Sequence, residues 1–176
     1  MGVLESERLL FRAHQAADLE PYCAMQADPE VRRYVGGQPR TREASERKFR
    51  EALEAGDSPL SLRATVFKPE GSYIGYCGLY PRFTPQGPAP GEAVLAFYLA
   101  HAYWGRGLAT EAGRLFLHVG FDEMHLNRIV ASVDVRHAAS IRVLEKLGFV
   151  LVETERGGRS FHHFELLCPH RRTIPL

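Results

Sequence analysis

The stretch that decides the fold covers residues 94–112 and reads VLAFYLAHAYWGRGLATEA. It opens with the continuous apolar run Val94–Leu99, which is typical of a strand buried on both faces. The segment Gly105-Arg106-Gly107 then leads into an amphipathic helix, expected over Leu108–Phe121. Because Arg128–Val133 reads as another strand, the order strand, glycine loop, helix, strand predicts a right-handed crossover that joins two parallel strands.

The chain before residue 94 is expected to supply further strands and two helices. The strands are expected at Leu9–Phe11, Leu62–Val66 and Tyr73–Tyr80, and the helices at Ala17–Ala27 and Thr41–Ala55. The second helix has clear boundary signals, because Thr41 is a suitable N-cap and Gly56 follows its last residue. Between Pro81 and Gly91, four prolines and two glycines predict a long loop of the kind that borders a binding site.

The chain after residue 133 is expected to complete the sheet. A helix over Ala138–Lys146 ends before Gly148, and the strands Val150–Glu153 and Phe161–Leu167 pair around Gly157-Gly158. These elements predict an α/β fold in which helices cover both faces of a mixed sheet of about six to seven strands. The 176 residues suit a single domain, residues 1–176.

Composition excludes several classes of protein. The chain is 45% hydrophobic and 24% charged, which excludes a disordered, collagen-like or membrane-spanning protein. The formal net charge of +1 gives no field to hold a nucleic acid. Three widely spaced cysteines without a CxxC motif indicate neither a disulfide framework nor a metal site. With no signal-peptide pattern at the N-terminus, we expect a cytoplasmic protein with no membrane contact.

A glycine loop between a buried strand and a helix is suited to binding phosphate. The first N–H groups of a helix have no internal partners, and glycine lets a ligand approach the backbone closely. Three interpretations compete at this point. A dinucleotide fingerprint needs a third glycine where Thr110 stands, a nucleotide P-loop motif is absent, and a structural turn needs no ligand at all.

The whole stretch Tyr103–Ala112 closely resembles the acetyl-CoA pyrophosphate loop of the GNAT acyltransferases, and within them the branch of RimJ/RimL-type protein N-terminal acetyltransferases. Further matches lie at 7–12, 28–31, 127–130 and 138–149, so the resemblance covers most of the chain. Two positions depart from the family pattern. Trp104 stands where the superfamily has Gln or Arg, and His137 stands where the family's Asn-x-x-Ser element begins with Asn.

The resemblance implies a GNAT fold whose sheet is splayed between Val94–Leu99 and Arg128–Val133, with acetyl-CoA as co-substrate. The pantetheine would bond to the backbone near Leu99 and Ala100, where a bulge would free an N–H for the thioester carbonyl. His137 and Ser140 would also contact it. The pyrophosphate would be held by Gly105, Arg106, Gly107, Leu108, Ala109 and Thr110, with added charge from Arg106.

Amine acetylation needs a neutral amine and a proton for the departing thiolate. Many GNAT enzymes supply that proton from a Tyr, but Leu144 stands at this place here. In the branch that this chain resembles, the Ser of Asn-x-x-Ser has that role, which points to Ser140; the alternative is an ordinary first-turn serine. Glu92 is the candidate base, against the alternative of a solvated carboxylate.

Other groups are weaker candidates for the base. These are His101 and Asp134, and deprotonation through water would need none of them. In the pair His162-His163, adjacent strand residues point to opposite faces, so one imidazole is expected to face the acceptor groove.

The function that follows is transfer of an acetyl group from acetyl-CoA to a primary amine by direct attack in a ternary complex. The acceptor expected from the resemblance is a protein N-terminus, such as that of a ribosomal protein. An aminoglycoside, a polyamine or an amino acid is an alternative acceptor, and a non-catalytic CoA-binding regulator is an alternative class. The expected assembly is a monomer or a homodimer.

Overall fold

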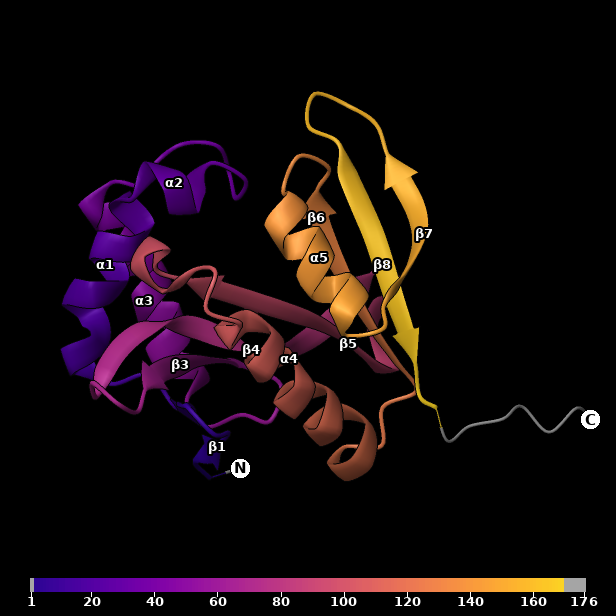
Figure 1. Ribbon diagram of the computed structural model, residues 1–176, viewed down its shortest axis with the longest axis horizontal. Coiled ribbons are helices and arrows are strands. Elements are labelled where there is room, and N and C mark those ends of the chain that lie inside the picture. The colour runs from indigo at the N-terminus through magenta and orange to yellow at the C-terminus, as the bar shows by residue number, and fades with distance from the viewer. Residues whose placement is uncertain (1, 170–176) are drawn as a thin grey trace, which may run out of the picture.

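The computed structural model describes residues 2–169, and these form one eight-stranded mixed sheet (Figure 1). The strands are β1 (Leu4–Glu5), β2 (Leu9–Arg12), β3 (Leu62–Phe67), β4 (Ser72–Thr84), β5 (Gly87–Leu99), β6 (Arg128–Asp134), β7 (Val150–Glu155) and β8 (Phe161–Leu167). Their order is β1-β2-β3-β4-β5-β6-β8-β7, and β5 and β6 form the parallel pair. The predicted crossover is confirmed, and the two-residue β1 adds one strand to the expected set.

The helices are α1 (Leu19–Ala27), α2 (Pro29–Arg32), α3 (Arg42–Ala55), α4 (Leu108–His118) and α5 (Ala138–Lys146). The start of α3 is as predicted, because Thr41 Oγ1 accepts a hydrogen bond from the N–H of Ala44. The helix expected over Leu108–Phe121 ends earlier, at His118, and a π-helical turn over Val119–Glu123 follows it.

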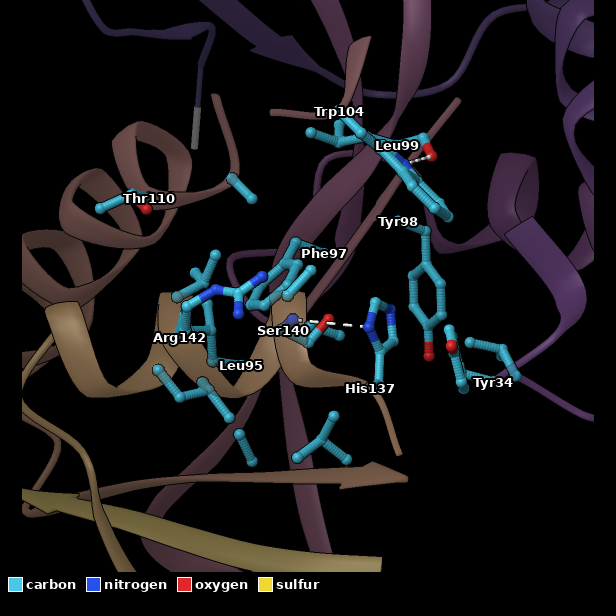
Figure 2. A pocket seen from close by; sticks show the side chains of 18 of the residues that line it. Tyr34, Leu95, Phe97, Tyr98, Leu99, Trp104, Thr110, His137, Ser140 and Arg142 are labelled. Atoms are coloured by element: carbon cyan, nitrogen blue, oxygen red, sulfur yellow. Dashed lines mark hydrogen bonds between the residues drawn. The ribbon is translucent and has the colours of Figure 1, made fainter. Parts of the chain in front are cut away.

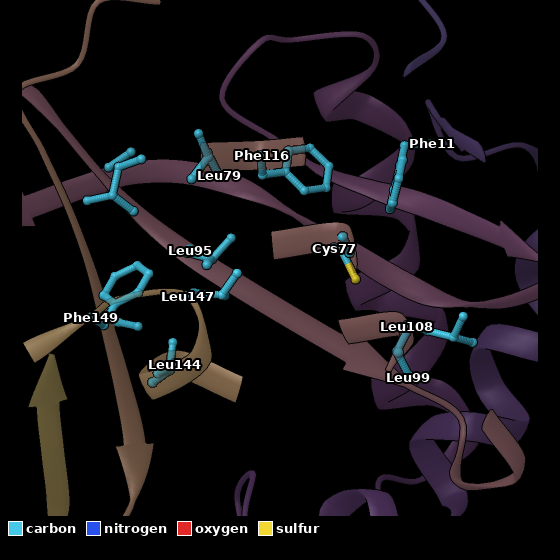
Figure 3. Close-up of a cluster of buried hydrophobic side chains, with 14 of the residues drawn as sticks. Phe11, Cys77, Leu79, Leu95, Leu99, Leu108, Phe116, Leu144, Leu147 and Phe149 are labelled. Carbon is cyan, nitrogen blue, oxygen red and sulfur yellow. The ribbon is translucent and has the colours of Figure 1, made fainter. Parts of the chain in front are cut away.

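Two separate clusters of buried side chains show that helices cover both faces of the sheet, as predicted. On one face, Leu108 and Phe116 of α4 and Leu144 of α5 pack with Leu79 and Leu95 (Figure 3). On the other face the second cluster joins Tyr22 and Cys23 of α1 and Phe49 of α3 to Tyr76 of β4. The alternation of Tyr76 and Cys77 between the clusters follows from the two-residue period of a strand.

The prediction of a long loop between Pro81 and Gly91 is wrong. These residues form a hairpin in which Pro81 pairs with Ala93 and Phe83 with Pro88, and only Pro85 and Gln86 lie between β4 and β5. Beyond Gly78, strand β4 has no partner on its β3 side, so the hairpin has open edges. Proline, which lacks an N–H, is tolerated at such edges.

Strands β5 and β6 pair over a short distance and then diverge (Figure 1). Their register runs from Glu92 opposite Arg128 to Val94 opposite Val130, and no pair follows. This confirms the expected splay. The prediction of a bulge near Leu99 is wrong, because β4 and β5 stay in continuous register from Ala93 to Leu99. Among the described residues, no helix is long and apolar enough to cross a membrane.

Candidate active site

A cavity of about 540 Å³ opens where β5 and β6 separate (Figure 2). Its walls come from the segment after α2, from β5, from the glycine loop and the first turn of α4, from the end of β6, and from α5. Of the residues predicted to bind cofactor, it is lined by Leu99, Gly105, Gly107, Leu108, Ala109, Thr110, His137 and Ser140. Residues far apart in the sequence therefore meet in one place.

The glycine loop presents bare backbone to this cavity. Gly105 and Gly107 have φ of 72° and 77°, in the left-handed region that favours glycine. Gly107 is the N-cap of α4 and provides no capping side chain, so the first N–H groups of the helix have no partner within it. A Cβ on Gly105 would meet no atom within 4 Å. This helix start can therefore take a phosphate group, through its N–H groups and the helix dipole.

Glu111 ties the glycine loop to the N-terminal segment. Its carboxylate accepts hydrogen bonds from the Ser6 hydroxyl and from the N–H and Nε of Arg8, each at 2.7 Å. Arg8 Nη1 also donates to the carbonyl of Arg106 at 3.0 Å. Burial acts to raise the pKa of Glu111, but the hydrogen bonds from Arg8 and Ser6 outweigh it and hold that pKa below its ordinary value. This network joins residues about 100 positions apart in the sequence, so no local pattern indicates it.

Positive charge reaches the cavity from two residues of the predicted helix α5 that the sequence did not single out. The guanidinium of Arg106 lies over the rings of Phe67 and Tyr103, at 4.5 and 5.3 Å, and Arg106 does not line the cavity. Arg142 and Lys146 of α5 do line it. They lie four residues apart, on one face of the helix, which is the signal that could have identified them.

The edge of β5 that faces the splay keeps hydrogen-bonding groups for a ligand. The N–H of Ala100 donates to Ile74 of β4 at 2.8 Å, and Ala100 does not line the cavity. Because backbone groups alternate in direction along a strand, those of Leu99 and Phe97 face the splay. The Leu99 carbonyl already accepts a hydrogen bond from Trp104 Nε1 at 2.7 Å, which gives Trp104 a definite packing role.

His137 is the N-cap of α5, and its Nδ1 accepts from the N–H of Ser140 at 3.5 Å (Figure 2). Its ring stacks on Tyr34 with centroids 4.3 Å apart. Burial lowers the pKa of His137, although Asp134 nearby acts in the opposite direction. The imidazole is therefore neutral at pH 7, and with Nδ1 as the acceptor its Nε2–H is left as a donor.

Ser140 lies in the first turn of α5 and lines the cavity, but the capping side chain is that of His137. Leu144, one turn further on, is 1% exposed and belongs to the core. Ser140 is thus the hydroxyl that this helix brings to the cavity.

The candidate bases differ in where they lie. Glu92 pairs with Arg82 at 2.7 Å and lies 3.9 Å from Arg128, and it does not line the cavity. Asp134 does line it, but hydrogen bonds from Arg136 and Arg159 hold its pKa far below its ordinary value in spite of burial. His101 packs on Trp104 with centroids 4.8 Å apart, outside the lining.

Two aromatic residues of the cavity were missed by the sequence analysis. Tyr98 and Tyr34 line the side next to His137 (Figure 2). Burial raises the pKa of Tyr98, so its hydroxyl is protonated at neutral pH. Tyr34 is held in place because its carbonyl accepts from Arg159 at 2.7 Å. It follows a four-residue helix and has no periodic pattern around it, so no local signal identified it.

Comparison with known proteins agrees with this geometry. The family model described as an acetyltransferase (GNAT) domain matches residues 8–150. The N-acetyltransferase p20 of Bacillus licheniformis is 31% identical over 153 residues, which cover 85% of this chain and 83% of that protein. The protein YkkB of Bacillus subtilis is 32% identical over 130 residues, 73% of each chain.

Solved structures show the same fold. A GNAT-family acetyltransferase from Bacillus anthracis superposes with a TM-score of 0.80 at 21% identity, covering 94% of this chain and 98% of that one. The ribosomal-protein-S5-alanine acetyltransferase from Vibrio fischeri gives 0.73 at 18% identity, covering 97% and 98%. The fold with the splayed sheet is thus shared with these solved structures. The chain belongs to the GNAT family and is a GNAT-family N-acetyltransferase.

Proposed function

We propose that this enzyme transfers the acetyl group of acetyl-CoA to a primary amine by direct attack inside the splay. The observation that carries the proposal is that the start of α4, the free edge of β5 and Ser140 all open onto one cavity. The proposed phosphate site is the backbone of Gly105 and Gly107–Thr110, with positive charge from Arg142 and Lys146. His137 Nε2–H would donate to a pantetheine carbonyl, as the family's Asn does.

Two chemical requirements of the reaction have a group on this chain, the donor for the developing oxyanion and the proton for the thiolate. A backbone N–H of β5 on the splay side polarises the thioester carbonyl, since buried N–H donors stabilise a developing oxyanion. Ser140 gives its proton to the departing thiolate. Glu92 remains a prediction as a base, but its ion pair with Arg82 and its place outside the lining favour another group.

For the acceptor we propose the N-terminal amine of a peptide or protein, as in the RimJ/RimL-like branch. Among the described residues, Asp134 is the one carboxylate that lines the cavity, and it is paired with Arg136 and Arg159. A polyamine or an aminoglycoside carries several positive charges and would need several unpaired carboxylates around it. A single amine beside the neutral side chains of Tyr34 and Tyr98 has no such need.

A thiol-release assay over a panel of amines tests the proposal. The panel holds short peptides with free N-termini, a polyamine, an aminoglycoside and a free amino acid. We expect CoA release with a peptide, and the same peptide with a blocked N-terminus is the matched control. Release with the polyamine alone would refute the acceptor class. Acetyl-CoA binding without turnover on any amine would identify a regulator and refute the enzyme.

A further inference from the structure

A hydrogen-bonded chain of three side chains lies at the splay on the sheet face opposite α4 and α5. Ser132 Oγ of β6 is 2.8 Å from His163 Nδ1 of β8, and His163 Nε2 is 3.2 Å from Glu155 Oε2 of β7. We call Ser132, His163 and Glu155 the relay. None of these residues is part of the proposed acetyl-CoA site.

The relay reaches the cavity through Ser132. This residue lies two positions beyond Val130, the last residue of β6 that pairs with β5, so it stands where the strands have begun to separate. Its neighbours Ala131 and Val133 are buried in the core under α4 and α5, so Ser132 faces the other side of the sheet. It lines the main cavity and also a second cavity of about 270 Å³, which His163 lines too. The acetyl donor and the relay therefore approach the splay from opposite faces.

The direction of the hydrogen bonds follows from the chemistry of the end group. The ionised Glu155 carboxylate can only accept, so His163 Nε2 carries the proton and Nδ1 is an unprotonated acceptor. The Ser132 hydroxyl must then donate to Nδ1, which leaves its oxygen lone pairs free toward the cavity. The imidazole is thus arranged to receive a proton through Ser132.

We propose that the relay takes the proton from the ammonium group of the acceptor, a step that rests on the proposed function. The ammonium N–H bond breaks and its proton goes to Ser132 Oγ, while the Ser132 hydroxyl proton passes to His163 Nδ1. The products are a neutral amine, an unchanged serine and an imidazolium whose charge is balanced by Glu155. The proton is later released to water. Ser132 is the catalytic residue, and His163 and Glu155 act through it.

Three other charged residues line the second cavity together with His163. The second cavity also holds Glu153 of β7, Arg82 of β4 and Arg128 of β6. The two arginines are paired, Arg82 with Glu92 and Arg128 with Glu165, each at 2.7 Å. They therefore leave Glu155 as the group bonded to His163 Nε2.

The test compares Ser132→Ala and His163→Gln with His162→Gln. His162 is the matched control, because it is adjacent in β8, points to the opposite face and bonds Thr154 at 2.9 Å. At pH 7, with the peptide acceptor, we expect kcat to fall about tenfold in both relay variants, because an α-amino group with a pKa of about 8 is roughly one-tenth neutral at that pH. The KM for acetyl-CoA should be unchanged. The deficit should shrink to about threefold or less as the pH nears the pKa of the acceptor amine, because free amine needs no base. The control should keep the wild-type rate.

A second measurement needs no acceptor. Long-range ¹⁵N–¹H NMR spectra report which ring nitrogen of His163 carries the proton, and we expect the Nε2–H form, lost to a tautomer mixture in Glu155→Gln. An Nδ1–H form in the wild type would overturn the relay. If the wild type is active, two further results would overturn the relay. One is a Ser132→Ala variant with an unimpaired kcat, and the other is a Ser132→Ala variant whose loss of kcat is the same at every pH. A wild type that acetylates no amine refutes the proposed function, and the relay with it.

Discussion

Placing a methyl group on Gly107 should weaken acetyl-CoA binding without disrupting the fold. Gly107 has φ of 77° and ψ of 1°, so Gly107→Ala forces an L-residue into the left-handed region, at about 1–2 kcal/mol of stability. The new Cβ would lie 3.7 Å from Arg8 Nη2, an ordinary contact, so the protein itself has room for it. The methyl would instead stand beside the first N–H groups of α4, where a phosphate must approach the backbone.

The expected loss of affinity is tenfold or more, which corresponds to about 1.4 kcal/mol. Gly71→Ala is the matched control, because Gly71 has φ of 64°, with open space for a Cβ, in the turn between β3 and β4. It should lose similar stability and keep its affinity. Titration calorimetry with acetyl-CoA and thermal unfolding measure the two quantities separately. Equal affinity in Gly107→Ala and wild type would remove this loop from the site.

Three further substitutions give distinct outcomes. Ser140→Ala should lower kcat by about 100-fold with little change in Tm, because His137 and not Ser140 caps α5; a normal rate would show that another group protonates the thiolate. His137→Asn should hold or improve acetyl-CoA affinity, since an Asn side chain can also cap the helix, and should flatten the pH dependence of that affinity below about pH 6.5, because burial lowers the pKa of His137; a tenfold loss would show that the site is built around imidazole. Burial lowers the pKa of His14 to about 4, so its stabilising neutral form is complete above about pH 6.5 and is lost as the pH falls toward 4. Denaturant unfolding at several pH values measures this effect: over this range the free energy of unfolding should fall by roughly 3 kcal/mol less in His14→Phe than in wild type. An equal dependence of the free energy of unfolding on pH in the two proteins would contradict the argument.

The order of strands and helices could be predicted because it rests on local signals. Such signals are the apolar run of β5, the apolar stripe of α4 and the cap at Thr41. Each of them is formed by residues that are close together in the sequence. The prediction of a loop at Pro81–Gly91 was wrong for a reason that is not local. Its prolines are compatible with strands because β3 ends early and leaves β4 an open edge.

The parts of the site that lie within a single motif were also predictable. Gly105, Gly107 and Ser140 line the cavity as their motifs indicated. Tyr34 and the relay could not be found in this way, because they depend on contacts between segments far apart in the sequence. Ser132 and His163 are separated by 31 residues, and only the antiparallel pairing of β6 and β8 brings them opposite each other. The sequence indicated that His162 and His163 face different sides and that one of them faces the acceptor groove, but it indicated neither which one nor its partners.

The destination of the acetyl group tests the central claim most directly. Among the described residues no cysteine lines the cavity, so direct transfer leaves no acetyl group on the enzyme. The enzyme is mixed with isotopically labelled acetyl-CoA and a peptide with a free N-terminus, and both are analysed by intact-mass and fragment mass spectrometry. The account predicts one labelled acetyl group on the peptide's N-terminal nitrogen and none on the enzyme at any time point. Label that first appears on the enzyme, or only in free acetate, would contradict it.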